Sequence, residues 1–75
     1  MKKTDNVLTL KLGQRIKQLR INKNLSQEDL ALICDLHRTY IGSCERGERN
    51  ITIQNVNKIC MALNISMKEF FSCFE

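Results

Sequence analysis

The sequence predicts an all-α fold, a bundle of five helices that forms a single domain over residues 1–75. Three observations support this prediction. Proline is absent, and Leu, Lys, Gln and Glu, which have high helix propensity, are plentiful. Apolar residues recur every three or four positions, which is the spacing of one helix face. A serine or threonine precedes three of these stretches, at the place of a helix N-cap.

The first expected helix runs from Thr9, or slightly earlier, to about Lys23. It follows residues 1–5, which are expected to form a frayed tail. Gly13 disfavours helix in the first turns, and Asn24 is suited to the left-handed residue that ends a helix. The apolar face of this helix consists of Leu8, Leu12, Ile16 and Leu19.

The second expected helix begins after Ser26 and ends near Cys34. Ser26 can cap this helix while Asp29, three residues on, approximates a capping box. The buried stripe of the helix consists of Leu30, Ala31 and Cys34. Residues 35–37 then form a tight turn, in which Asp35 tolerates a left-handed backbone better than most residues do.

The third and fourth helices are expected on either side of a loop over residues 48–51. The third runs from about Arg38 to Arg46, and Gly47 follows it, where glycine commonly ends a helix. Thr52 caps the fourth, which ends at Asn64. The inward residues are Ile41 and Cys44 in the third helix, with Glu45 alongside them, and Val56, Ile59, Cys60 and Leu63 in the fourth.

The chain is basic, with a formal net charge of +4. This charge is concentrated in residues 1–25, which hold seven basic residues and one acidic residue. A basic chain suits a polyanion, either nucleic acid or an anionic membrane. No apolar run approaches the roughly 18 residues that span a membrane, and no secretory signal is recognisable. We therefore expect a cytoplasmic protein without a membrane partner.

The four cysteines are Cys34, Cys44, Cys60 and Cys73. Disulfides or a zinc site are alternatives for four cysteines in a short chain, but no CxxC pair is present. Three of the cysteines fall on apolar helix faces, so we expect free core thiols and no metal, cofactor or small-molecule ligand. His37 lies near Cys34, but a Cys–His nucleophile also needs a pocket and an orienting group. The sequence therefore predicts no enzymatic activity.

Residues 27–46, QEDLALICDLHRTYIGSCER, form two short helices joined by a tight turn. Small Ala31 and Gly42 allow the two helices to cross closely, as in a helix-turn-helix. This stretch resembles the helix-turn-helix of phage repressor and Cro-type regulators, which implies a lambda repressor-like fold. The combination LHRTYIG…ERGERNIT resembles, more narrowly, the controller proteins of bacterial restriction–modification systems. Asp35 departs from the family pattern, because many members have glycine in the turn.

The resemblance implies a transcriptional regulator that binds double-stranded DNA operators, upstream of its own gene and the endonuclease gene, as a homodimer. Side-chain chemistry agrees, because Arg38 at the start of the second of these helices can form paired hydrogen bonds to guanine. Gln27 is expected at a phosphate, and Arg46, Arg49 and Asn50, which follow this helix, are expected at phosphates or in a flanking groove. The predicted DNA-binding residues are Gln27, Arg38, Thr39, Tyr40, Ser43, Arg46, Arg49 and Asn50. The resemblance also implies a structural ion pair between Arg15 and Glu45.

A short fifth helix is expected after Ser66, which with Glu69 forms a capping box. It carries more large apolar side chains than one small core can bury, and residual apolar area marks a partner surface. We therefore expect residues 64–75 to serve dimerisation; the alternative is that the rings fold back on the first helix as core. The predicted interface consists of Leu63, Phe70, Phe71 and Phe74.

Other functions are compatible with the same residues. A prophage repressor or an antitoxin would use the same DNA-binding unit. A protein-interaction module without DNA binding is a further alternative, which Arg38, Arg46 and Arg49 argue against because they place positive charge around the third helix. RNA polymerase is a candidate partner of a regulator of this kind.

Overall fold

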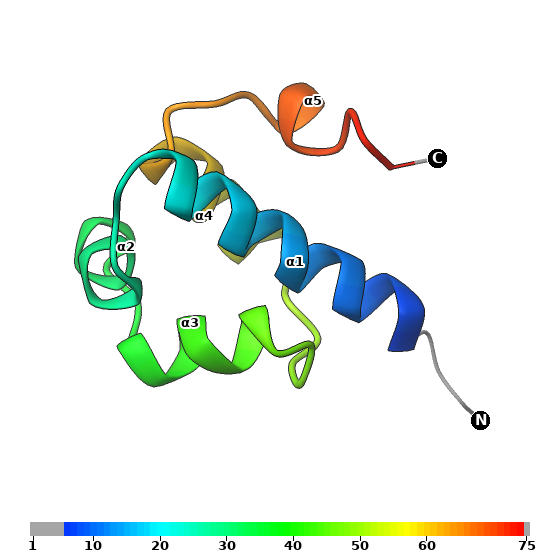
Figure 1. Cartoon of the computed structure of the whole chain (residues 1–75), viewed down its shortest axis with the longest axis horizontal. Coiled ribbons are helices and arrows are strands. Elements are labelled where there is room, and N and C mark those ends of the chain that lie inside the picture. The colour runs from blue at the N-terminus through cyan, green and yellow to red at the C-terminus, as the bar shows by residue number, and fades with distance from the viewer. Residues whose placement is uncertain (1–5, 75) are drawn as a thin grey trace.

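The computed structural model describes residues 6–74 and contains helices without strands in that range (Figure 1). The all-α prediction is confirmed, and the predicted tail, residues 1–5, lies outside the described residues. The helices are α1 (Asn6–Asn22), α2 (Gln27–Cys34), α3 (Arg38–Glu45), α4 (Ile53–Ala62) and α5 (Met67–Phe70). Over residues 6–74, no helix combines the length and apolarity that crossing a membrane requires.

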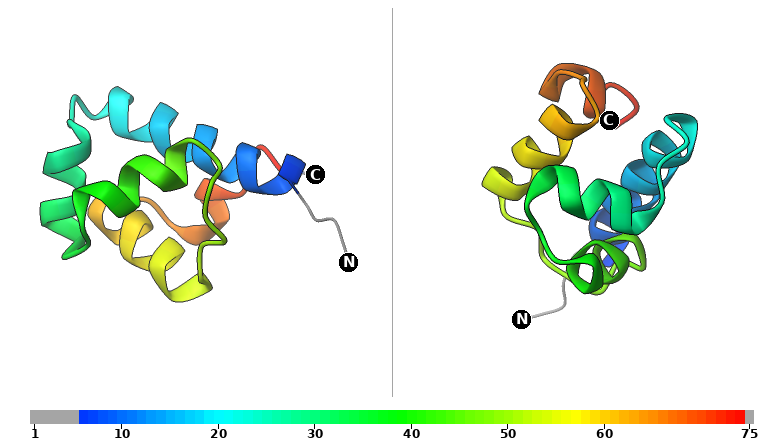
Figure 2. Two further views of the ribbon diagram at one scale, coloured as in Figure 1. Left: turned by 90° about the horizontal axis from the view of Figure 1, so that it is seen from below. Right: turned by 90° about the vertical axis from the view of Figure 1, so that its left-hand side faces the viewer.

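Helix α1 crosses the molecule, with α3 on one side and α5 on the other (Figure 1). Helix α2 links α3 to α4, because it packs against both of them (Figure 2). Every helix contributes a fully buried side chain to one core. These side chains are Ile16, Leu30, Ile41, Ile59 and Phe70, with Leu63 directly after α4.

Local signals set the helix boundaries, as the sequence predicts. Ser26 and Asp29 form the reciprocal capping box of α2, with bonds of 2.9 and 3.0 Å. Thr52 caps α4 by accepting a hydrogen bond from the backbone N–H of Asn55. Ser66 begins α5 by accepting a bond of 2.9 Å from the backbone N–H of Glu69, which is one of the two bonds of the predicted capping box. Left-handed residues follow the first, second and fourth helices at Asn24, Asp35 and Asn64, and Gly47 follows the third.

The first turns of α1 agree with the prediction in position but not in burial. The helix begins at Asn6, slightly before Thr9 as expected, whereas Leu8 is 47% exposed instead of belonging to the buried face. Gly13 is buried where α1 crosses the end of α3. A Cβ atom there would meet the Cys44 carbonyl oxygen and lie 2.7 Å from that of Glu45. Gly13 is therefore a packing requirement of the helix crossing and not a weak point of the helix.

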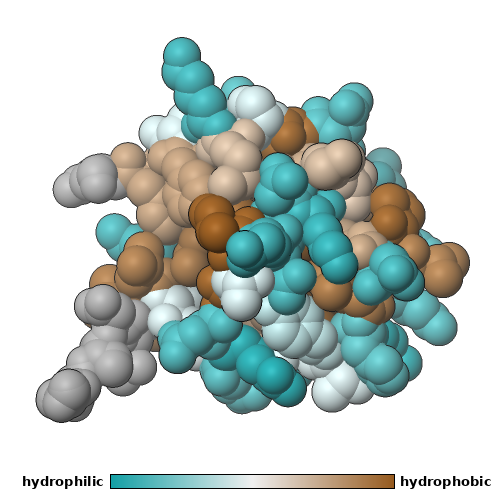
Figure 3. Space-filling model, turned by 180° about the vertical axis from the view of Figure 1, so that it is seen from behind, coloured by the Kyte–Doolittle hydropathy of each residue, from teal (hydrophilic) through white to brown (hydrophobic). Residues whose placement is uncertain are grey.

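The predicted dimer interface is wrong for Leu63 and Phe70. Both side chains are 0% exposed in the single chain, so neither can lie at the centre of a partner surface. The reason is that α5 folds back over the core, and the Phe70 ring fills the space beneath it. Phe71 and Phe74 are only half-buried, with ring centroids 5.2 Å apart. Figure 3 shows a broad apolar area in the left half of the view and smaller apolar areas at its right edge.

Three of the four cysteines lie in the core, as their spacing predicts. Cys34, Cys44 and Cys60 are buried, whereas Cys73 is exposed, and all four are free thiols. Burial raises the pKa of the three buried thiols, to about 11 at Cys34. These residues act as small apolar core side chains.

Candidate DNA-binding surface

Helix α3 is divided along its length into an exposed start and a buried end. Arg38 and Thr39 are exposed in its first turn, whereas residues 41–45 are all buried. Helix α2 packs across α3, as a helix-turn-helix requires. In such units the first turn of the second helix faces base edges in the major groove. The fold therefore exposes the first turn of α3 to a binding partner and holds the rest of the helix in the core.

Ser43 belongs to the anchored part of α3, contrary to the prediction that it contacts DNA. It is 7% exposed, and its hydroxyl donates a 2.9 Å hydrogen bond to the backbone carbonyl of Tyr40. Ser43 is one helical turn beyond Tyr40, but it lies on the protein side of the helix. Its hydroxyl is therefore satisfied within α3 and is not presented to a partner.

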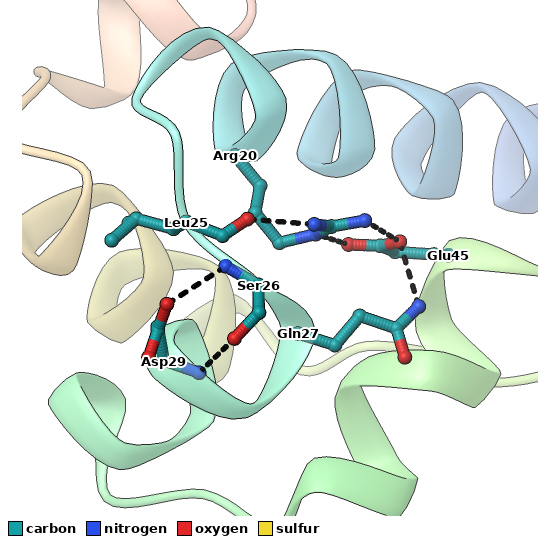
Figure 4. Close-up of polar contacts among 6 residues, drawn as sticks. All are labelled: Arg20, Leu25, Ser26, Gln27, Asp29 and Glu45. Carbon is teal, nitrogen blue, oxygen red and sulfur yellow. Dashed lines mark hydrogen bonds and ion pairs between the residues drawn. The ribbon is translucent and has the colours of Figure 1, made fainter.

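A buried ion pair fixes the end of α3 to α1 (Figure 4). Arg20 donates to both carboxylate oxygens of Glu45, over 2.6 and 3.0 Å. A third bond, of 2.7 Å, runs from Arg20 to the backbone carbonyl of Leu25, which lies before α2. The hydrogen bond to Glu45 raises the pKa of Arg20. One guanidinium therefore holds α1, the start of α2 and the end of α3 together.

The predicted partner of Glu45, Arg15, is therefore wrong. Arg15 donates to the backbone carbonyls of Glu69 and Phe70, each over 2.8 Å. Helical spacing explains the difference, because Arg20 follows Gly13 and Ile16 on the stripe that faces α3. Arg15 lies on another face, where it satisfies carbonyl groups at the end of α5.

Gln27, at the N-terminus of α2, is linked to the same carboxylate (Figure 4). Its side-chain amide donates a 3.0 Å bond to Glu45, and its Oε1 lies beside Gly42. A Cβ atom on Gly42 would come within 3.3 Å of this oxygen. Gln27 thus fills the crossing of the two helices, while its backbone stands at the positive end of α2, where an anion is favoured.

The remaining predicted residues lie around the loop between α3 and α4. Arg46 and Arg49 are exposed, as is Asn50. Arg46 pairs with Glu48 over 3.1 Å at the surface, and such exposed pairs are weak enough to exchange for a phosphate. Arg49 lies over the ring of Tyr40 at 5.3 Å. Tyr40 is half-buried rather than fully presented to a partner.

Comparison with known proteins agrees with this geometry. Residues 16–70 match the protein-family model described as helix-turn-helix. The chain is 49% identical over 65 residues to the control protein C.BamHI of Bacillus amyloliquefaciens, covering 85% of this chain and 80% of that protein. This chain belongs to the control proteins of the helix-turn-helix family.

Solved structures of control proteins share the fold. The restriction–modification controller protein C.AhdI from Aeromonas hydrophila is 45% identical, with a TM-score of 0.84, covering 87% of this chain and 98% of that one. C.Esp1396I, solved as a tetramer in complex with its natural 35 base-pair operator, is 42% identical with a TM-score of 0.83, covering 87% of this chain and 86% of that one. Like its family, this control protein is a sequence-specific DNA-binding transcriptional regulator.

Sequence reasoning missed two residues that support the candidate DNA-binding surface from within the protein. Arg20 could have been found from its position four residues after buried Ile16. Asn55 donates a 3.0 Å hydrogen bond to the Tyr40 hydroxyl, a contact between α4 and α3 that no local pattern predicts. Over residues 6–74, no group of three or more His, Cys, Asp or Glu residues is placed to hold a metal ion.

Proposed function

We propose that this control protein binds an operator in its own restriction–modification system as a homodimer, in the cytoplasm and without catalytic activity. The observation that carries the proposal is the exposed first turn of α3 on an otherwise buried helix. The operator complex of C.Esp1396I supports it. Variants of that protein replace, one at a time, three consecutive residues, an arginine, a threonine and a tyrosine. This chain carries the same tripeptide at residues 38–40.

The proposed contacts divide into base reading and backbone binding. Arg38 reads guanine through paired hydrogen bonds, and Thr39 beside it contacts a thymine methyl group or a phosphate. Arg46 and Asn50 bind phosphates, as does the N-terminus of α2 at Gln27. The exposed positions of Arg38, Thr39, Arg46 and Asn50 support this division, because none of these residues is needed in the core.

We further propose that a second copy covers Phe71 and Phe74, within the segment 64–75. Their rings are half-buried in the single chain, with centroids 5.2 Å apart, and so leave apolar surface exposed. A symmetric dimer is the most common solution for such a surface, and it would present its two α3 helices to half-sites about 34 Å apart. Sedimentation at micromolar concentration tests this arrangement. A monomer with undiminished operator affinity would contradict it.

Binding isotherms on two duplexes test the division of contacts. One duplex is selected by the wild-type chain from a random pool, and the other is its scrambled sequence. Arg38→Ala should weaken binding to the selected duplex by about 1–3 kcal/mol and binding to the scrambled duplex much less. Arg46→Ala should weaken both similarly and reduce the salt slope by about one unit. Equal losses on both duplexes for Arg38→Ala would make it a phosphate contact instead of a base reader.

A further inference from the structure

The side chain of Tyr40 is held from α4 by a single amide. Asn55 Nδ2 donates a hydrogen bond of 3.0 Å to the Tyr40 hydroxyl. The backbone of Asn55 is fixed in the first turn of α4, because its N–H donates to the capping hydroxyl of Thr52 over 3.1 Å. The Tyr40 hydroxyl also lies beside the buried thiol of Cys44. The polar end of this tyrosine is therefore engaged within the protein.

The ring of Tyr40 supports the guanidinium of Arg49, an exposed residue in the loop between α3 and α4. The guanidinium carbon lies 5.3 Å from the ring centroid, within the range of a cation–π contact. A cation–π contact of this kind uses no N–H···O hydrogen bond, so the donors of the guanidinium remain available for a phosphate. An exposed arginine otherwise loses considerable rotamer freedom when it binds a phosphate.

We propose that Asn55 is a positioning residue for DNA binding: it fixes the Tyr40 ring, which in turn holds Arg49 in place to meet the duplex backbone. Tyr40 then acts mainly through Arg49 rather than through its own hydroxyl. The inference rests on the proposed function, because it requires Arg49 to contact DNA. It adds a residue of α4 that touches no nucleotide yet lowers the ordering cost of one that does.

The expected effect is a loss of affinity that does not depend on sequence. Asn55→Ala should weaken binding to the selected and the scrambled duplex alike, by about 2- to 12-fold, the range for releasing one ordered side chain. Tyr40→Phe removes the same hydrogen bond from the other side and should cause a similar loss. In a chain that already carries Arg49→Ala, Asn55→Ala should cause no further loss. Asn57→Ala is the matched control, since Asn57 is an exposed asparagine of the same helix whose amide faces Met61 within α4.

An optical measurement tests the contact separately from DNA binding. Tyr40 is the only tyrosine and the chain has no tryptophan, so tyrosinate absorbance reports on this residue alone. Burial raises the pKa of Tyr40, whereas the hydrogen bond from Asn55 and the charge of Arg49 lower it. Asn55→Ala and Arg49→Ala should therefore each raise the pKa further, and Asn57→Ala should leave it unchanged. Circular dichroism at each pH checks that the fold persists.

Three results would overturn the inference. The first is a Tyr40 pKa that Asn55→Ala leaves unchanged. The second is an affinity of Asn55→Ala for both duplexes that stays within twofold of the wild-type affinity. The third is a double variant in which the losses of affinity from Asn55→Ala and Arg49→Ala multiply. The proposed function fails in a different way, through a wild-type chain that binds the selected and scrambled duplexes equally. A wild-type chain that prefers the selected duplex, together with any of the three results, overturns only the role of Asn55.

Discussion

Helix α1 has two contact faces, and they are built differently. The face toward α3 combines the close backbone approach at Gly13 with the buried pair of Arg20 and Glu45. On the face toward α5, Arg15 bonds backbone carbonyls near the surface, and the rings that follow α5 stay half-exposed. The first face is complete within one chain, whereas the second has apolar area left over. The part that positions α3 thus needs no partner, and the part that is open to a partner lies away from it.

The largest effect should come from breaking the ion pair on the first face. Arg20→Ala leaves Glu45 without its cation, although the Glu45 side chain is only 3% exposed. We expect a loss of about 3–5 kcal/mol in the free energy of unfolding, as for other broken buried pairs. Denaturant melts measure it, with Lys17→Ala as an exposed control on the same helix. A loss below about 1 kcal/mol would show that the contact between α1 and α3 does not depend on this pair.

Gly13→Ala tests the backbone approach on the same face. Alanine favours helix over glycine by about 1 kcal/mol, but its Cβ atom would collide with the Cys44 and Glu45 carbonyl oxygens. We expect a net loss of about 1–3 kcal/mol, because α1 must move away from α3. Gln14→Ala, at the exposed neighbouring position, provides the control for helix propensity. A Gly13→Ala chain as stable as wild type would mean that the crossing is loose.

Removing Arg15 should have a smaller effect on the second face. Its two hydrogen bonds go to backbone carbonyls, and one of them is exposed to solvent. Arg15→Ala should therefore lower the free energy of unfolding by about 1 kcal/mol. The same melts that measure Arg20→Ala give this value. Equal losses for the two arginines would erase the distinction between the faces of α1.

The reactivity of the four thiols separates the core from the segment that follows α5. Cys73 is exposed and should react with a thiol reagent in the native protein, whereas the three buried cysteines should react only on unfolding.

Burial raises the pKa of Cys34 to about 11. The stability that this neutral thiol contributes is present below the unfolded pKa, roughly 8.5, and is lost as the pH rises through the folded value. Melts that show no decline between about pH 9 and pH 11 would contradict this expectation.

The sequence predicted best what short-range chemistry decides. The caps at Ser26 and Thr52 and the left-handed residues at Asn24 and Asp35 follow from interactions within a few residues, and all were confirmed. The choice of arginine for the pair with Glu45 could not be predicted in this way, because it depends on how α1 crosses α3.

The same limit applies to the binding surface. Whether Ser43 faces the protein or the solvent depends on which side of α3 meets its neighbours. The bond from Asn55 to Tyr40 joins residues of two helices across the loop. Such contacts depend on how the helices pack together, so the apolar spacing along a single helix does not predict them.

The division of α3 into an exposed start and a buried end has an evolutionary consequence. Substitutions at positions 38 and 39 change side chains that the core does not use, and surface changes of this kind usually alter stability by less than about 0.5 kcal/mol. Residues 41–45 have no such freedom, since each is buried. A regulator and its operator can therefore diverge together through a few tolerated replacements, while the scaffold stays constant.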